Sequence, residues 1–172
     1  MCFYKLIHSH RFSDRLLGVT SSDKLSSDVH GEVVRRFTQH GQRYTAQRRA
    51  IVIVLANSDR PLTIPQMLKR TNGTKGSLAQ SSLYRNLTVL ENAGVVQRVF
   101  STDDVGRYEL NDDILGHHHH MVCSKCGEVR DVRIPESLET NLDSALTTLA
   151  KRSGFRLDQH RLDLIGRCSK CA

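Results

Sequence analysis

The spacing of hydrophobic residues predicts helices along most of the first hundred residues. The first helix has one buried face, made by residues four apart: Val29, Val33 and Phe37. Residues 1–28 lack this periodicity, and their last part, the serine-rich run at 21–27, is typical of a linker. We therefore expect residues 1–28 to form a mobile N-terminal arm.

Residues that cap helices mark the next two helical segments. The second helix is predicted from Thr45, as its N-cap, to Asn57. Thr63 caps the third helix, which continues to the break at Asn72-Gly73. Between these boundaries the hydrophobic residues again fall on one face, so each helix can pack against the first.

The fourth predicted helix carries the most functional information. Ser81 or Ser82 caps it, Gly94 ends it, and its buried face holds leucines at helical spacing. Its other face exposes polar and aromatic side chains: Tyr84, Arg85 and Thr88. A β-hairpin follows, with alternating residues at 96–100 and 107–110. Helices and a hairpin in this order predict a winged helix-turn-helix, although an ordinary helical domain could also expose these residues.

The second half of the chain has a different pattern. A hinge at 111–116 is predicted to separate a DNA-binding domain at 29–110 from a second domain at 117–172. The second domain begins with a histidine-rich strand, continues with another strand and a helix from Pro135, and ends with a strand reaching about Ile165. The predicted fold class is therefore α+β, with a small α/β domain at the C-terminus.

The charge is divided unevenly between these two parts. Residues 1–100 contain 15 Lys and Arg against 6 Asp and Glu, whereas residues 101–172 contain 10 against 12. A basic first domain fits binding to double-stranded DNA. No segment is apolar enough to span a membrane, and the start lacks a signal-peptide core. We expect a cytoplasmic protein without a membrane partner.

Two Cys-x-x-Cys pairs in the second domain predict a metal site. The four-residue sequence C-S-K-C occurs twice, from Cys123 to Cys126 and from Cys168 to Cys171. Two such turns together supply the four thiolates of a closed, structural zinc site. An iron–sulfur or rubredoxin-like iron site is the alternative, and a thioredoxin-type redox pair fits less well because there are two pairs. Cysteines in the cytoplasm stay reduced, which favours metal over disulfides.

Four consecutive histidines precede the first cysteine pair. In a strand, His118 and His120 point to one face while His117 and His119 point to the other. One strand could therefore serve two metal sites. The alternative is a solvated polar run or a purification tag, but tags are usually terminal, and this run leads directly into a Cys-x-x-Cys pair.

Over residues 29–172 the chain resembles the ferric uptake regulator family of metal-responsive bacterial transcription regulators. The resemblance rests on four motifs taken together: R-Y-T-A-Q-R at 43–48, S-L-Y-R-N-L at 82–87 with E-N-A-G at 91–94, the histidine run before Cys-x-x-Cys-Gly, and the final Cys-x-x-Cys. It implies a homodimer, joined through the C-terminal domain, that binds inverted-repeat operators as a repressor when loaded with metal. It also implies structural Zn²⁺ at the four cysteines and no catalysis.

The resemblance also assigns site residues. It implies DNA contacts from Tyr84, Arg85 and Arg43, and Ser82, Thr88 and Arg48 are expected to contribute beside them. It implies a regulatory metal site formed by His118, His120, Glu109 and Asp131. A second site would contain His117, His119, His160 and Glu139, although Glu139 lies one residue later than the family pattern. Such mixed ligands suit Fe²⁺, Zn²⁺ or Mn²⁺.

The sequence departs from its relatives at the ligands expected from the first domain. Asn111 stands where many zinc-sensing members have Cys, Asn92 stands where they have Asp, and the His of iron- and peroxide-sensing members falls near Pro61. The missing ligand must come from elsewhere. The candidates are His40, Asp112, Asp113 and the arm residues His8 and His10.

Two other classes of protein would also use histidine and cysteine ligands. A zinc hydrolase or deaminase would need an open metal position beside a general base, and the H-x-E with P-C-x-x-C signature is absent. A metal-storage or zinc-chaperone protein would explain the histidines but not the fourth helix. We therefore expect no small-molecule substrate.

Overall fold

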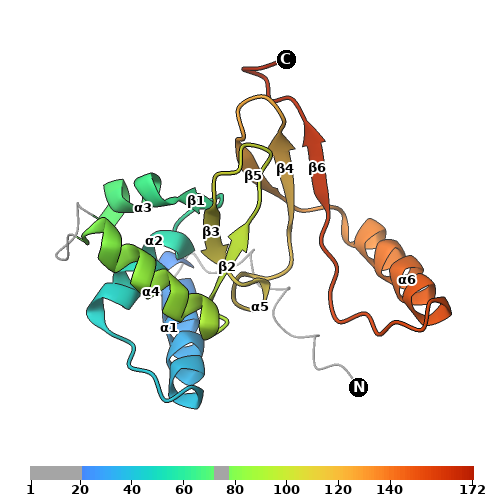
Figure 1. Cartoon of the computed structure of the whole chain (residues 1–172). Coiled ribbons are helices and arrows are strands. Elements are labelled where there is room, and N and C mark those ends of the chain that lie inside the picture. Colours follow the sequence, from blue (N-terminus) through green and yellow to red (C-terminus); the bar gives the residue numbers. More distant parts are fainter. Residues whose placement is uncertain (1–20, 72–77) are drawn as a thin grey trace.

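The computed structural model describes residues 21–71 and 78–172, and their side chains from residue 28 onward (Figure 1). Helices α1 to α4 and a three-stranded sheet lie on one side of the molecule. A second three-stranded sheet and helix α6 lie on the other. The chain is thus a mixed helix and sheet protein, as its hydrophobic pattern predicts.

The first part of the chain contains four helices and a very short strand. Their bounds are α1 Ser21–Gln39, α2 Ala46–Ala56, β1 Leu62–Thr63, α3 Ile64–Thr71 and α4 Gln80–Asn92. The residues expected on the buried faces are buried, including Val33, Phe37, Ile51, Leu83, Leu87 and Leu90. The helical periodicity in the sequence therefore identified the core of this part correctly.

The start of α1 differs from the prediction. Residues 21–27 belong to this helix, so the linker predicted there was wrong. Serine has only a weak preference against helix, and a helix anchored further along by Val29 and Val33 can extend through such residues. The rest of the predicted arm, residues 1–20, lies outside the described residues.

The capping predictions have mixed outcomes. Thr45 caps α2, and its side chain accepts a hydrogen bond from the Arg48 amide. Thr63 and Gln66 bond reciprocally, each side chain to the other's backbone amide, as in a capping box. The serine cap of α4 was wrong, because that helix begins earlier, after Ala79, which makes no side-chain cap.

Strands β2 (Val96–Val99) and β3 (Arg107–Leu110) form the predicted wing. The sheet order is β1-β3-β2, and both neighbouring pairs are antiparallel. Phe100, expected in the first wing strand, lies just beyond β2 and is exposed. Three helices, α4 and this sheet give the winged helix-turn-helix expected from the sequence.

The second part contains one helical turn, one long helix and three strands. Their bounds are α5 Asp112–Leu115, β4 His119–Cys123, β5 Val129–Val132, α6 Glu136–Arg152 and β6 Asp163–Gly166. Strand β4 is central, antiparallel to β5 and parallel to β6. The segment predicted as a hinge thus contains one helical turn, and the predicted last strand is shorter, so that His160 precedes it.

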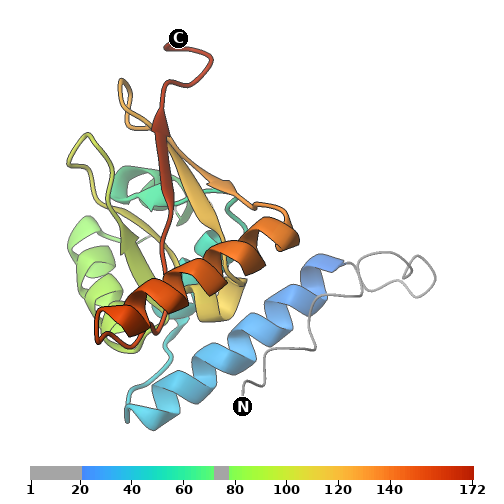
Figure 2. The same ribbon diagram turned by 90° about the vertical axis from the view of Figure 1, so that its right-hand side faces the viewer.

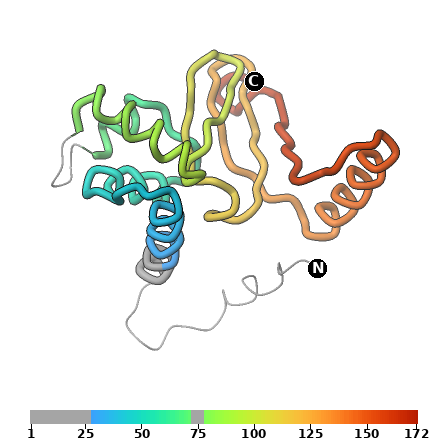
Figure 3. The backbone as a smooth tube through the Cα atoms, turned by 60° about the horizontal axis from the view of Figure 1, so that its bottom comes forward, coloured from blue at the N-terminus to red at the C-terminus, as the bar shows by residue number. Residues whose placement is uncertain are grey.

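Helix α6 lies at the edge of the molecule and is nearest the viewer in Figure 2. None of its residues is buried, although its apolar face was predicted as clearly as those of α2 and α4. In Figure 3, α6 lies on the far side of the molecule from α2, α3 and α4. Among the described residues, no helix has the length and apolar character needed to cross a membrane.

Candidate metal centres and DNA-binding surface

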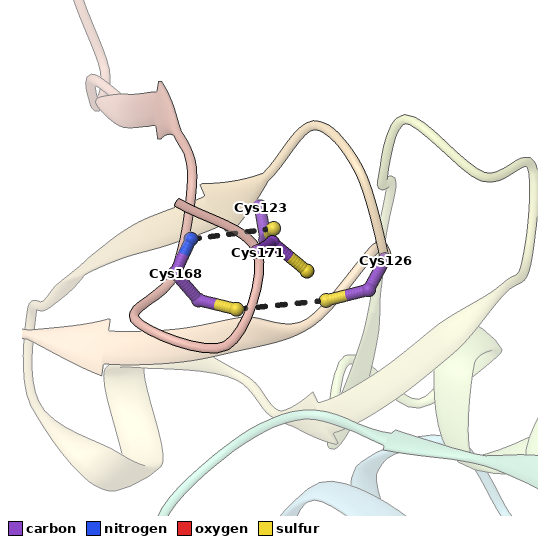
Figure 4. A group of neighbouring side chains, drawn as sticks. All are labelled: Cys123, Cys126, Cys168 and Cys171. Atoms are coloured by element: carbon purple, nitrogen blue, oxygen red, sulfur yellow. Dashed lines mark hydrogen bonds between the residues drawn. The ribbon is translucent and has the colours of Figure 1, made fainter.

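The two Cys-x-x-Cys turns come together at the end of the second sheet. The four thiols of Cys123, Cys126, Cys168 and Cys171 converge on one space, with their sulfur atoms all within 4.8 Å of one another (Figure 4). Parallel pairing of β4 with β6 brings the turns together, because each turn directly follows its strand. Four sulfurs at this spacing match the ligands of a closed tetrahedral site.

The protonation of these thiols also fits a cation. The amide of Cys168 donates to Cys123 Sγ at 3.4 Å, and such backbone donors lower the pKa of Cys123 to about 6. The neighbouring thiols, Cys126 first, raise the pKa of Cys171 to about 12. One thiolate therefore forms easily, whereas four require a positive charge among them. A divalent cation would supply that charge.

Glu109 is the centre of a second cluster, between the wing and the second sheet. Its Oε2 atom lies 3.3 Å from His118 Nε2 and 3.1 Å from His120 Nε2. Asp131 on β5 completes the cluster, with Oδ1 at 3.9 Å from His120 Nε2. All four potential ligand atoms lie within 4.8 Å of one another. The cluster thus joins β3 of the first part to β4 and β5 of the second.

Burial and hydrogen bonding set the charges in the Glu109 cluster. Burial opposes ionisation of Glu109, but hydrogen bonds from His118 and His120 outweigh it and lower the pKa of Glu109 to about 2. The bond to Glu109 raises the pKa of His118 to about 9. Burial raises the pKa of Asp131 to about 6. The pairing of Glu109 with His118 therefore offsets the cost of burying the Glu109 charge.

A third cluster forms on the opposite face of β4. His119 Nε2 bonds to Glu139 Oε2 at 2.9 Å, and the other oxygen, Oε1, lies 3.2 Å from His117 Nε2 and 3.1 Å from His160 Nε2. Helix α6 supplies Glu139, and the segment before β6 supplies His160. Glu139 therefore occupies the position expected for it, despite lying one residue late in the sequence.

Both histidine clusters contain buried polar atoms without hydrogen bonds. Among the described residues these include His120 Nδ1 and Asp131 Oδ1 in one cluster, and His117 Nε2, Glu139 Oε1 and His160 Nε2 in the other. The last three face one another at close range without the geometry of a hydrogen bond. Buried groups are rarely left in this way, and a shared cation at their centre would satisfy them.

Several neighbours of these clusters were not singled out from the sequence. Asp163 Oδ1 lies 3.4 Å from His120 Nδ1, and Asp143 Oδ1 lies 2.9 Å from His160 Nδ1. Gln97 of β2 donates to Glu109 Oε1 at 2.8 Å. Asp143 could have been found, because it follows Glu139 by one helical turn. Gln97 gave no signal, because its position depends on the register of the wing.

The candidates for a ligand from the first domain have different surroundings. Asp112 lies close to the Glu109 cluster, with Oδ1 at 3.4 Å from His118 Nδ1. Asp113 pairs instead with Arg36, and His40 bonds to a carbonyl of its own helix. His8 and His10 lie outside the described residues. Only Asp112 of the three described candidates approaches a cluster.

The turn of the wing also contacts the first Cys-x-x-Cys turn. Ser101 Oγ donates to the Gly127 carbonyl at 3.1 Å, and Thr102 Oγ1 donates to the Cys123 carbonyl at 3.3 Å. Val99 packs in a small buried cluster with two valines of the second sheet, Val122 and Val129. The two parts of the chain therefore meet both at this turn and at Glu109.

The outer face of α4 presents the side chains predicted to contact DNA. Tyr84 is 48% exposed, and Arg85 and Thr88 are also exposed, while Ser82 is half-buried. Arg43, just before α2, is exposed as well. The leucines of α4 point inward, so the helix can present this face to a groove without losing its packing.

Arg48 has several contacts within the protein. Its Nε atom donates to Asn86 Oδ1 at 3.2 Å, and Nη1 donates to the carbonyl of Arg43. Asn86 in turn donates to Gln47 Oε1 at 3.2 Å. These bonds hold α4 against the start of α2. Arg48 is thus placed to fix the angle of α4, which adds to the DNA contact expected of it.

Comparison with known proteins gives consistent matches. The sequence model of the ferric uptake regulator family matches residues 39–165. The ferric uptake regulation protein of Rhizobium leguminosarum bv. viciae is 31% identical over 140 residues, covering 81% of this chain and 94% of that protein. The peroxide operon regulator of Bacillus subtilis is 29% identical over 141 residues, covering 82% and 92%.

A solved structure has the same fold. The Helicobacter pylori ferric uptake regulator superposes with a TM-score of 0.67 and 21% identity, covering 85% of this chain and 93% of that one. That protein is described as having three functional metal-binding sites. The present chain likewise brings potential ligands together in three clusters among its described residues.

Proposed function

Because the chain belongs to the ferric uptake regulator family, we propose that it is a metal-dependent transcription regulator that represses genes by binding operator DNA as a homodimer. Members of this family are regulators and not enzymes, so the hydrolase alternative is set aside. The proposal assigns DNA binding to α4, structural zinc to the four cysteines, and regulation to the Glu109 cluster.

The contact between Glu109 and the two histidines supports the regulatory assignment most directly. Glu109 lies on the wing, whereas His118 and His120 belong to the segment that enters the second sheet. A metal held by all three would fix the wing, and with it α4, relative to the second sheet. Metal binding would then favour the arrangement of α4 that fits DNA.

The exposed apolar residues of the second part support a homodimer. Large hydrophobic side chains on or beside α6 and β6 are exposed: Leu138, Leu149, Phe155, Leu164 and Ile165. All four residues of β6 are exposed, and β6 is an edge strand of its sheet. An apolar helix face beside an exposed edge strand fits a second copy of the chain. Two copies would present two α4 helices to an inverted repeat.

The ligand types limit the choice of metal. Histidine with carboxylate suits Fe²⁺, Mn²⁺ or Zn²⁺, and neither histidine cluster includes a thiolate. The relatives are named for ferric uptake and for a peroxide response. We propose Fe²⁺, Mn²⁺ or Zn²⁺ as the regulatory metal, and Zn²⁺ as the structural metal at the cysteines.

A DNA-selection experiment tests this function. The purified protein, loaded in turn with Fe²⁺, Mn²⁺ and Zn²⁺, is incubated with a pool of random-sequence duplexes, and the bound duplexes are sequenced. We expect an inverted repeat to be enriched with at least one metal and not after a chelator has stripped the histidine sites. Equal enrichment with and without metal would contradict metal-dependent binding, and no enriched sequence would contradict operator recognition.

A further inference from the structure

Asp112 lies between the two histidine clusters and contacts both. Its Oδ1 atom is 3.4 Å from His118 Nδ1, and its Oδ2 atom is 3.6 Å from His117 Nδ1. His118 belongs to the Glu109 cluster, and His117 belongs to the Glu139 cluster. One carboxylate thus faces one histidine of each cluster, using a different oxygen for each.

The rings of His117 and His118 have the same orientation relative to Asp112. The Nε2 atom of His118 points to Glu109, and the Nε2 atom of His117 points to Glu139. Each ring therefore directs Nε2 into its own cluster and Nδ1 toward Asp112. A neutral histidine that binds metal through Nε2 carries its proton on Nδ1 and commonly donates it to a carboxylate or carbonyl. His118 has such a carbonyl as well, at 3.1 Å in Gly116.

Gln97 holds Asp112 in this position. Its Nε2 atom donates to Asp112 Oδ1 at 3.1 Å and to Glu109 Oε1 at 2.8 Å. The same amide thereby orients Glu109 so that its other oxygen faces the histidines. Asp112 is thus connected to a ligand of the first cluster through Gln97, and to both clusters through the histidines.

We propose that Asp112 couples the two histidine clusters, so that metal bound at one raises the affinity of the other. The inference rests on the proposed function, because it assumes that both clusters bind metal. With a cation held by His118 Nε2, the Nδ1 proton would be a stronger donor, and Asp112 Oδ1 would accept it alongside the Gly116 carbonyl. The Oδ2 atom of Asp112 would then already be in place for His117. The Glu139 cluster would therefore lose less conformational freedom when it binds its own metal.

Titration with Co²⁺ measures this coupling. The parent retains its cysteine-bound zinc, and Co²⁺ occupancy of each cluster is followed by absorption. His119→Ala removes a ligand from the Glu139 cluster but keeps His117 and Asp112. The affinity of the Glu109 cluster in the parent, divided by its affinity in His119→Ala, gives the coupling factor. We expect about tenfold, within the usual range for linked sites.

Asp112→Asn is the decisive variant. Its side chain has the same shape but only one oxygen, so it can accept from one of the two histidines at a time. Repeating the measurement in this background should reduce the coupling factor to about 1–2, while both clusters still bind Co²⁺. Asp113→Asn is the matched control, because Asp113 lies next in α5 but pairs with Arg36. It should keep the coupling of the parent.

A second readout guards against a folding defect in the Asp112 variant. In the Zn²⁺-loaded protein, nuclear magnetic resonance should detect strongly hydrogen-bonded Nδ1 protons on both His117 and His118, and Asp112→Asn should weaken at least one. Unchanged coupling and unchanged Nδ1 protons in Asp112→Asn would overturn the inference. A coupling factor of about 1 in the parent would overturn the inference as well. That result would not contradict metal-dependent DNA binding. If neither cluster bound Co²⁺ in the parent, both this inference and the proposed function would fail.

Discussion

His118 holds a proton in the metal-free protein, and a metal must displace that proton to use Nε2. The bond to Glu109 raises the pKa of His118 from 6.5 to about 9. A proton bound more tightly in the folded chain stabilises the fold fully below pH 6.5, and this contribution is lost as pH rises through about 9. Proton and metal therefore compete over the whole neutral range.

This competition predicts a pH dependence of metal affinity. Between pH 7 and 9 the affinity of the Glu109 cluster should rise by about tenfold per pH unit, and it should level off above pH 9, as expected for release of one proton. Competition with a chromophoric chelator at several pH values measures this affinity. A flat profile from pH 7 to 9 would show that the metal does not displace a proton from His118.

The role proposed for the four cysteines differs from that proposed for the histidines, and one substitution tests the difference. Cys168→Ser should release the zinc and unfold the second part of the chain, since metal binding and folding are coupled in such sites. Zinc content and circular dichroism measure the two effects. Ser169→Ala, in the same turn, should retain both zinc and fold. A folded, zinc-free Cys168→Ser protein would contradict a structural role for the metal.

At the scale of residues, the sequence predicted which potential metal ligands lie close together, but not what surrounds them. Alternation along one strand separates His118 and His120 from His117 and His119, and this needs no knowledge of the rest of the fold. Glu139 was placed by the family resemblance and not by the helical pattern, because a shift of one residue turns a helical position by about 100°. The positions of Asp112 and Gln97 depend on how α5 and the wing fold back on the histidines, and no local pattern records that arrangement.

At the scale of elements, the proposed function assigns DNA recognition to α4, which is supported by α2. Arg85 is exposed on α4, and Arg43, just before α2, is exposed as well. Arg85→Ala should weaken binding to the selected operator by about 1–3 kcal/mol if it reads a base. Arg43→Ala should weaken all duplexes similarly and make the salt dependence shallower, as expected of a phosphate contact.

Fluorescence anisotropy with selected and scrambled duplexes, at several salt concentrations, distinguishes the two effects. Lys69→Ala, at an exposed position of α3, serves as a control that removes a positive charge outside α4. It should change operator affinity less than either arginine variant. Unchanged affinity in both arginine variants would mean that another element contacts the DNA.

Element boundaries were harder to predict than element types. The helical periodicity of α1, α2 and α4 located their cores, because it reflects burial against neighbouring helices. The ends depend on weaker effects: α1 extends through serines, α4 begins before its supposed serine cap, and β6 is short because only four of its residues pair with β4. Strand β1 has two residues and no pattern of its own; it exists because β3 lies beside it.

At the scale of the whole molecule, the exposed apolar surface of α6 and β6 predicts the oligomeric state. Ile165 is 67% exposed, so a charge there would not disturb the packing of the single chain. Ile165→Asp should therefore convert a dimer into a monomer while leaving the zinc in place, because a buried charge without a partner opposes association. Light scattering coupled to size-exclusion chromatography measures the mass.

Val105→Asp is the matched control for this experiment. Val105 is also apolar and 43% exposed, but it lies in the turn of the wing. This variant should remain a dimer. A dimeric Ile165→Asp protein, or a monomeric parent, would contradict the proposed arrangement of two chains through the second part.

Control of DNA binding by metal at the Glu109 cluster is the central proposal. The direct test is the operator affinity of the parent and of His118→Ala, titrated separately with Fe²⁺, Mn²⁺ and Zn²⁺ while the cysteine-bound zinc is retained. The parent should bind its selected operator about 5–150-fold more tightly with at least one metal, the usual range for such coupling. His118→Ala should remain folded and dimeric, and should bind with the same weak affinity whether metal is present or not. If the variant responded to every metal as the parent does, the switch would not lie at this cluster.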